Sequence, residues 1–373
     1  MIVKIGDVIS EYSVRNKFDE NIPVYSVTNE KGFCTGYFSK EVASKDKSTY
    51  KIVPRGYFAY NPSRINVGSV DWQKYEDRVI VSPLYVVFGV SDRLDRQYLL
   101  HYLKSDMMLS FIKEYATGSV RDNLKLADLG KLPINLRPVE EQRQIATTLD
   151  KIDDLIAKRR QQLDKLDELV KSRFVEMFGD PTYNPKGYKI KKLSQLGELN
   201  RGVSKARPRN SPELLGGPYP LVQTGEVTAS ELYINTYENT YSEKGLAQSR
   251  MWPKGTLCIT IAANIAQTAI LNIDACFPDS VVGFIPGKEV TQIYMHYWFT
   301  FFQKILEEQA PQVAQKNINL KILNDLDVMV PERTLQEQFE KLVNQTDKSK
   351  LAIQKSLDKL EILKKALMQK YFG

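Results

Sequence analysis

The sequence predicts an α+β chain with an internal pseudo-two-fold repeat: two tandem domains of similar fold, separated by two long helices that form an antiparallel coiled coil. Three observations support this prediction. The chain repeats itself at a spacing of about 195 residues, two segments carry strand-like runs, and two segments of helical pattern contain neither proline nor glycine. The expected segments are a domain over 1–138, a helix over 139–179, a domain over 180–334 and a helix over 335–373.

The repeat is clearest inside the helical segments. The run Leu-Asp-Lys-Leu begins at Leu163 and again at Leu357, and a Phe-Gly pair closes the two segments at Gly179 and Gly373. This spacing is far too long for a solenoid, whose units have about 20 to 50 residues. The unit of duplication is therefore a whole domain followed by a long helix.

The same spacing pairs shorter motifs in the rest of the chain. It places His101 opposite His296, each followed by a tyrosine, and Gln142 opposite Gln338, each preceded by a glutamate. We therefore expect the two histidines, and the two Glu-Gln pairs, to occupy equivalent positions in the two repeats.

Both domains are expected to mix strands with a helix. β-branched and aromatic runs such as 56–60, 85–88 and 257–261 alternate with Pro, Gly and Asn, a pattern typical of strands and turns. One longer apolar stretch in each domain, about 95–115 and about 290–308, contains no Pro or Gly and predicts a helix. Each domain is therefore predicted to be α+β.

Each helical segment carries apolar residues at steps of three and four, the heptad pattern of a coiled coil. The stripe is interrupted by Arg159 in the first segment and by Thr346 and Lys350 in the second. A helix of this length spans roughly 55 Å at 1.5 Å per residue, so it needs a partner along its length, and the other helix is the nearest one. The residues expected in the interface of the helix pair are Leu149, Ile152, Ile156, Leu163, Leu166, Val170, Ile353, Leu357, Leu360 and Leu367.

The composition limits the class of protein. The 373 residues, 42% hydrophobic and 26% charged, leave room for two or three folded domains. No apolar run approaches the ~20 residues that span a bilayer and no signal peptide is visible, so we expect a cytoplasmic protein. Three scattered cysteines predict neither a disulfide framework nor a zinc site. A net charge of +7 permits a polyanionic partner such as DNA without requiring one.

Motifs for catalysis or cofactor binding are poorly represented. The segment 61–64 is similar to the Asn-Pro-Pro-aromatic loop of adenine methyltransferases, but Ser63 and Arg64 replace the second proline and the aromatic ring on which a flipped adenine would stack. No Gly-x-Gly loop follows a predicted strand, and no phosphate-binding loop for ATP is present. We therefore expect no catalytic residue, no metal and no cofactor bound by this chain, and we interpret His101 and His296 as structural.

Three basic segments that also contain Gly, Ser or Asn are candidates for DNA contact: 117–125, 201–209 and 312–317. The first and third hold equivalent places in the two repeats. Lys and Arg neutralise phosphates, Arg pairs with guanine, and Asn or Gln pairs with adenine. For any one residue, a solvated surface charge is the alternative interpretation. The candidates for DNA binding are Arg64, Asn66, Ser119, Arg121, Asn123, Lys125, Arg201, Lys205, Arg207, Gln315, Lys316 and Asn317.

Taken together, these features resemble the specificity (S) subunit of type I restriction-modification systems, over essentially the whole chain. The long helices of that family open with a Pro-x-x-Glu-Gln type element, which here reads 138–142 and, in a looser form, 331–338. Three stretches inside the domains, 60–68, 255–261 and 275–283, are similar to stretches of the family's recognition domains. The order, duplication and alternation of these motifs carry the resemblance.

The resemblance implies a non-catalytic subunit of a DNA adenine-N6 methyltransferase and endonuclease complex. Two target recognition domains would each read one half of a bipartite, asymmetric site in double-stranded DNA, and the helices would set the spacing between the halves. Two methyltransferase (M) subunits would carry S-adenosylmethionine, and restriction (R) subunits, where present, would carry ATP and Mg.

Two alternatives stay open at this point. The chain could be an enzyme that modifies or cuts DNA on its own, in which case the purified chain would turn over substrate. It could also be a non-specific coiled-coil tether whose basic loops are incidental, in which case it would bind DNA without sequence preference.

Overall fold

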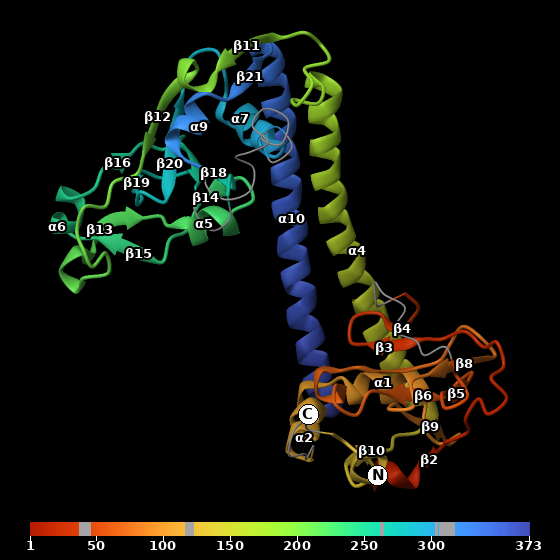
Figure 1. The fold of residues 1–373 in the computed structure, drawn as a ribbon. Helices are drawn as coiled ribbons and strands as arrows, with labels where there is room; N and C mark the ends of the chain where they lie inside the picture. Colours follow the sequence, from red (N-terminus) through yellow and green to blue (C-terminus); the bar gives the residue numbers. More distant parts are fainter. Residues whose placement is uncertain (37–45, 116–122, 262–264, 303–304, 306–317) are drawn as a thin grey trace. The chain divides into compact units, whose positions relative to one another are not determined.

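The computed structural model describes residues 1–36, 46–115, 123–261, 265–302, 305 and 318–373. The chain forms two compact units (Figure 1). Unit 1 consists of Met1–Arg160 and Lys355–Gly373, and unit 2 consists of Gln161–Gln354. Each unit holds one globular domain with strands and helices, together with about half of both long helices. The α+β fold and the tandem repeat predicted from the sequence are confirmed.

The globular domain of unit 1 is built on an antiparallel four-stranded sheet in the order β2-β9-β6-β7. Three strand pairs complete it: β1 with β10, β3 with β4 and β5 with β8. The strands are β1 (Ile2–Lys4), β2 (Ile9–Glu11), β3 (Ser26–Thr28), β4 (Gly32–Cys34), β5 (Lys51–Pro54), β6 (Phe58–Tyr60), β7 (Val70–Trp72), β8 (Arg78–Val81), β9 (Val86–Val90) and β10 (Pro133–Asn135).

The apolar stretch at about 95–115 forms two helices, so the prediction of a single helix is wrong. Helix α1 spans Arg96–Leu103 and α2 spans Asp106–Tyr115. Between them the Ser105 hydroxyl donates to the Tyr102 carbonyl at 2.7 Å and accepts from the Met108 amide at 3.3 Å. Serine makes such bonds readily at a helix start, and they end one helix and begin the next. The remaining helices of this domain are η1 (Ile5–Asp7), η2 (Ile65–Val67) and α3 (Leu126–Leu129).

The globular domain of unit 2 has a larger sheet system. One sheet has five strands in the order β12-β20-β17-β18-β14, a second has four in the order β15-β13-β19-β16, and β11 pairs with β21. The strands are β11 (Lys189–Lys192), β12 (Gly197–Arg201), β13 (Leu215–Leu221), β14 (Tyr233–Ile234), β15 (Asn239–Tyr241), β16 (Met251–Trp252), β17 (Leu257–Thr260), β18 (Thr268–Leu271), β19 (Ala275–Cys276), β20 (Val281–Pro286) and β21 (Asp327–Val330). The helices are η3 (Leu193–Gln195), η4 (Pro212–Leu214), α5 (Thr224–Ala229), α6 (Glu243–Ala247), α7 (Gln292–Phe299) and α9 (Leu320–Asn324). Of the helix expected at about 290–308, α7 is described in full, and 303–304 and 306–308 lie outside the described residues.

Both domains close in the same way before their long helix. In unit 1 the first strand, β1, pairs antiparallel with β10, and Val3 faces Ile134. In unit 2 β11 pairs antiparallel with β21, and Ile190 faces Met329. The chain therefore returns to the first strand of its domain immediately before each long helix begins. The two repeats share this strand pairing.

The long helices are α4 (Val139–Phe178) and α10 (Arg333–Phe372), each of 40 residues. At 1.5 Å per residue each is about 60 Å long. Helix α4 ends at Gly179, which has a φ of +80° and whose amide bonds the Val175 carbonyl at 2.7 Å. A glycine after the last turn adopts this left-handed conformation without steric cost.

The two helices pack antiparallel within each unit. In unit 1 Asp153 pairs with Lys364 at 2.5 Å and Arg160 with Glu361 at 2.8 Å, so residue numbers rise along α4 as they fall along α10. In unit 2 the Phe174 ring lies 5.4 Å from the Phe339 ring. The predicted antiparallel helix pair is thus confirmed.

A buried glutamine joins the start of α4 to the start of α1. Gln142 is fully buried, and its side-chain oxygen accepts from the Asp95 amide at 2.8 Å. Its side-chain nitrogen donates to the Arg93 and Arg137 carbonyls at 3.0 and 2.7 Å. Asp95 is the N-cap of α1, so this single side chain ties the domain to its long helix.

The counterpart of Gln142 in unit 2 is Gln336, so the predicted pairing with Gln338 is wrong. Gln336 is also fully buried, accepts from the amide of the α7 N-cap Thr291 at 2.9 Å, and donates to the Glu289 and Pro331 carbonyls at 2.9 and 2.8 Å. Gln338 is exposed. The buried hydrogen-bonding site selects the equivalent residue, whereas the neighbouring Glu-Gln dipeptide only resembles it.

The predicted equivalence of the two histidines is wrong as well. When α1 and α7 are aligned at their N-caps, Asp95 and Thr291, Tyr98 corresponds to Tyr294. Both tyrosine hydroxyls donate to a carbonyl of the domain's last strand, at 3.1 and 2.8 Å. In this register His101 corresponds to Tyr297, one position away from His296.

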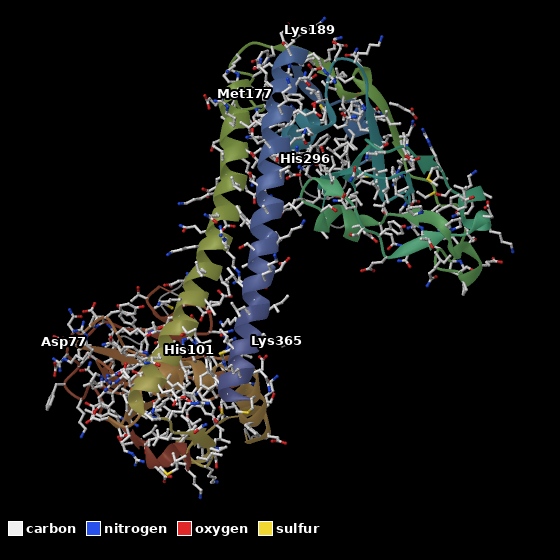
Figure 2. The ribbon with its side chains drawn as sticks, turned by 180° about the vertical axis from the view of Figure 1, so that it is seen from behind. Asp77, His101, Met177, Lys189, His296 and Lys365 are labelled. Carbon is white, nitrogen blue, oxygen red and sulfur yellow. The ribbon has the colours of Figure 1, made fainter. Side chains whose placement is uncertain are left out.

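Figure 2 labels both histidines, His101 in unit 1 and His296 in unit 2. They have different partners. His101 Nε2 lies 2.8 Å from Asp150 Oδ1 on α4, whereas His296 Nδ1 lies 3.0 Å from Thr268 Oγ1 on β18. Burial lowers the pKa of His296 to about 4, so this imidazole is neutral at pH 7. Both side chains are buried and hydrogen-bonded inside their units.

Candidate nucleic-acid interface

In unit 1 the loop that carries Arg64 is shaped by its own side chains. Asn61 Oδ1 accepts from the Ser63 amide at 3.1 Å and from the Ser63 hydroxyl at 3.0 Å, an Asx turn. Gly68 closes the loop with a φ of +86°. Arg64 is exposed and Asn66 is half-buried, and the Arg64 side chain makes no hydrogen bond or ion pair within the described part of the chain.

The structure brings this loop next to the segment that precedes α3. The Leu124 amide donates to the Pro62 carbonyl at 3.1 Å, and the Tyr60 hydroxyl donates to the Leu124 carbonyl at 3.0 Å. Burial raises the pKa of Tyr60, which keeps its hydroxyl protonated as a donor. The exposed candidates Asn123 and Lys125 flank Leu124, whereas Ser119 and Arg121 lie outside the described residues.

A cleft of about 280 Å³ adjoins Arg64. Asn61 and Tyr85 line it, and so do Asn29 and Glu30 from the turn between β3 and β4. Sequence reasoning missed Asn29 and Glu30 because no basic residue type marks them. Amide and carboxylate side chains can nevertheless accept or donate at base edges.

In unit 2 the basic segment 201–209 converges on one carboxylate. Arg209 hydrogen-bonds Asp279 Oδ1, Arg207 lies 3.7 Å from Asp279 Oδ2, and Arg201 Nε donates to the Asp279 backbone carbonyl at 3.0 Å. Two guanidinium groups at the carboxylate and a third at the backbone carbonyl of the same residue leave a local excess of positive charge. Asp279 belongs to the stretch 275–283, and its role in gathering the arginines was not predicted.

Lys205 lies in the same segment and is held through its backbone. Its amide donates to Gln248 Oε1 at 2.7 Å, and its exposed ammonium group makes no hydrogen bond or ion pair among the residues that the structure describes. A lysine so placed can meet a phosphate. Gln315, Lys316 and Asn317 lie outside the described residues.

A further charged group lies on strand β12 and immediately before strand β16 of the same domain. Arg250 donates to Glu198 at 2.6 Å, and its guanidinium stands 4.0 Å from the centroid of the Trp252 ring. The hydrogen bond from Arg250 holds the pKa of Glu198 below its ordinary value. Because the charge of Arg250 is balanced by Glu198 and its guanidinium stacks on the Trp252 ring, we interpret Arg250 as a structural residue of the domain.

None of the ten residues expected between the helices is exposed. Leu149, Ile152, Ile156, Val170 and Leu357 are buried. The half-buried ones are Leu163, Leu166, Ile353, Leu360 and Leu367.

Two further kinds of site are absent from the described residues. Nowhere in that part of the chain do three His, Cys, Asp or Glu side chains come together so that they could hold a metal ion. Among the helices described, none is both long and apolar enough to cross a membrane.

The chain is similar to proteins of one family. The family model for the type I restriction modification DNA specificity domain matches residues 2–168 and again 185–365. The putative type I restriction enzyme MjaX specificity subunit of Methanocaldococcus jannaschii is 21% identical over 354 residues, covering 89% of this chain and 80% of the relative.

Two solved structures share the fold. One is the S subunit of a type I restriction-modification system from M. genitalium, with a TM-score of 0.59 and 15% identity, covering 100% of this chain and 96% of that one. The other is a chain from a structural study of complex assembly and conformational transition of the type I R-M system. It has a TM-score of 0.61 and 18% identity, covering 100% of this chain and 97% of that one.

Specificity subunits of this family are in general non-catalytic. The family model matches both repeats described above, and the resemblance seen in the sequence is confirmed. The chain belongs to the type I restriction modification DNA specificity family, as a specificity subunit.

Proposed function

We propose that this subunit reads a bipartite, asymmetric DNA target, with one half-site for the recognition domain over 1–138 and one for the domain over 180–334. The helices over 139–179 and 335–373 set the spacing between the halves. One observation carries the proposal: each domain is closed by the same pair of terminal strands and tied by a buried glutamine, Gln142 or Gln336, to its own long helix. Two recognition domains fixed to one helix pair would add their binding free energies only on DNA targets whose half-site spacing matches the distance between the domains.

The DNA contacts proposed for unit 1 come from two neighbouring loops. Arg64 and Lys125 are exposed, basic and brought together by the Pro62–Leu124 hydrogen bond, and Asn66 and Asn123 stand beside them. An arginine contacts guanine through two hydrogen bonds and an asparagine contacts adenine in the same way. Ser119 and Arg121 belong to the same proposed surface by their place in the sequence.

The DNA contacts proposed for unit 2 centre on the arginines that converge on Asp279. Arg201 and Arg207 are held in place by hydrogen bonds, and Lys205 extends from a fixed backbone. This combination suits a surface that neutralises phosphates and presents side chains in a defined geometry. Gln315, Lys316 and Asn317 are proposed as further contacts because they occupy the place in the second repeat that 119–125 occupy in the first.

The proposed protein partners are two M subunits, which would carry S-adenosylmethionine and methylate adenine at N6, and R subunits, which would carry ATP and Mg. Apolar side chains exposed on the long helices support docking of partner helices. In unit 1 these are Leu155, Ile362 and Leu363, and in unit 2 Leu169 and Leu351. Large aliphatic side chains on a helix pair that already has an apolar seam are typical of a further interface.

The test is a map of adenine methylation in cells with and without the gene for this chain. Loss of one bipartite motif in the deletion strain, restored by the wild-type gene, is the expected result. An unchanged set of motifs would contradict the proposal. The purified chain incubated with DNA and S-adenosylmethionine should transfer no methyl group, and turnover by the chain alone would favour a stand-alone enzyme.

A further inference from the structure

Helix α10 places a charged side chain in the apolar seam of the helix pair. Lys350 lies fourteen residues after the buried Gln336, as Ile156 lies fourteen residues after Gln142. The Lys350 side chain is only 13% exposed. The first repeat shows that an isoleucine suits this position, and burying a charge carries a desolvation cost, so the lysine calls for a reason other than packing.

Two carboxylates from different parts of unit 2 pair with Lys350. Its ammonium group lies 2.7 Å from Asp167 Oδ1 on α4, and it also hydrogen-bonds Glu231, which follows α5 in the globular domain. Burial alone would lower the pKa of Lys350, but the two carboxylates raise it above its ordinary value. These three residues, here called the Lys350 bridge, therefore link both long helices to the recognition domain.

The Lys350 bridge lies further along α10 than other attachments between this domain and the helices. One of these is the buried Gln336, and another is an aromatic cluster in which Phe174 stacks on Tyr294 at 5.6 Å and meets Phe339 at 5.4 Å. Phe339 and Lys350 are eleven residues apart, about 16 Å along the helix. Attachments separated by this distance can fix an angle more closely than attachments near the start of α10 alone.

Among the described residues, few hydrogen bonds or ion pairs join the domain to α10 beside the bridge. A cleft of about 820 Å³ separates α10 from the segment 229–236, and both Lys350 and Glu231 line it. Across the same cleft the Tyr233 hydroxyl donates to Asn344 at a long 3.4 Å. Removing the bridge would therefore leave little in this region to hold the domain at one angle.

We propose that Lys350, through Glu231, is a positioning residue that sets the angle of the second recognition domain on the helix pair and so sharpens selectivity for the spacer length of the DNA target. The proposal rests on the bipartite reading proposed above. Among the described residues the bridge touches no DNA candidate, so it acts on the distance between the half-sites and leaves the reading of each half-site unchanged.

Two variants and one control test the bridge. Glu231→Gln removes the carboxylate of the domain and leaves the Lys350–Asp167 pair intact. Lys350→Met removes both pairs with a side chain of similar length that suits an apolar seam. Lys348→Met is the matched control, because Lys348 is exposed, lines the same cleft, and has no ion pair within the described residues.

The measurement uses the full chain purified with its methyltransferase partner and duplexes carrying the mapped target. Affinity is measured for the natural spacer and for spacers one base pair longer and shorter. We expect both bridge variants to lose roughly threefold to tenfold of the preference for the natural spacer, with affinity for a single half-site and the melting temperature of the complex unchanged or higher. Lys348→Met should retain the wild-type preference.

The outcomes separate this inference from the proposed function. If the wild-type complex shows no preference between spacers, bipartite reading itself fails. If the wild type discriminates and Glu231→Gln and Lys350→Met discriminate equally well, the positioning role is overturned while bipartite reading stands. A uniform loss of affinity for all duplexes, together with a lower melting temperature, would show a merely structural role and would equally overturn the inference.

Discussion

The buried glutamine that ties each domain to its long helix gives a sharp prediction for unit 2. Gln336→Leu replaces a fully buried amide with an apolar side chain of similar size. It leaves the Thr291 amide and the carbonyls of Glu289 and Pro331, which Gln336 contacts at 2.8 to 2.9 Å, without this partner. A buried polar group left unsatisfied costs about 1–3 kcal/mol, so the free energy of unfolding of unit 2 should fall by about 3 kcal/mol.

Hydrogen exchange followed by mass spectrometry locates this effect. The amide of Thr291, the N-cap of α7, should exchange about 100-fold faster in Gln336→Leu, which corresponds to about 3 kcal/mol. The control is Gln338→Leu, because Gln338 is exposed, and changes at such sites usually stay within about 0.5 kcal/mol. Equal effects of the two substitutions, or no faster exchange at Thr291, would refute the assignment of Gln336 as the counterpart of Gln142.

Three further predictions concern stability and spacing. Burial lowers the pKa of His296 from 6.5 to about 4, so as the pH falls the imidazole is protonated in the unfolded chain before it is protonated in the folded one. The free energy of unfolding of unit 2 should therefore fall by up to about 3 kcal/mol between about pH 6.5 and about pH 4. His296→Gln should lack that component of the pH dependence of thermal unfolding. Gly202→Ala would place a Cβ 2.3 Å from the Pro278 carbonyl oxygen and 2.4 Å from that of Phe277, so it should lower the melting temperature, whereas Gly225→Ala, which meets nothing within 4 Å, should not. Insertion of one heptad into the helix at 141–178 alone should misalign the helix pair, and so abolish methylation of the natural target or alter its spacer. Unchanged spacing and activity would contradict the role of the helices in setting the distance between the half-sites.

The long helices and the duplication could be predicted because local patterns determine them. A 40-residue segment without Pro or Gly and with apolar residues at heptad steps has few alternatives to a packed helix. The break at Ser105 could not be predicted in this way. Serine is favoured at helix caps but is also tolerated inside helices, so its presence alone does not mark a break, and the bonds to Tyr102 and Met108 decide between the two.

Alignment of the two repeats by sequence failed where similar residues lie one or two positions from the equivalent ones. His296 and Gln338 match by letter, but the hydrogen bonds of the helix caps select Tyr297 and Gln336. A buried polar site demands specific partners, and those partners come from segments more than forty residues away. For Gln142, the Leu-Asp-Lys-Leu runs at Leu163 and Leu357, 194 residues apart, already indicate Gln336; for His101, only the helix caps indicate Tyr297.

The candidate DNA-binding residues were predicted as regional clusters of residue types, and their grouping came only from the structure. The sequence offered Arg64 and Lys125 as separate candidates, and the contact between Pro62 and Leu124 makes them neighbours. In the same way Asp279 gathers arginines that lie about seventy residues before it. Long-range backbone contacts of this kind leave no periodic pattern in the sequence.

The central claim, that each repeat reads its own half of one DNA target, is tested most directly by base-substitution profiles of the reconstituted complex. Binding is measured to duplexes in which every position of the mapped target is changed in turn, for the wild type, for Arg64→Ala with Lys125→Ala, and for Arg201→Ala with Lys205→Ala. The account predicts that the first pair weakens discrimination within one half-site and the second pair within the other. Loss of discrimination in the same half-site for both pairs, or in neither, would contradict it.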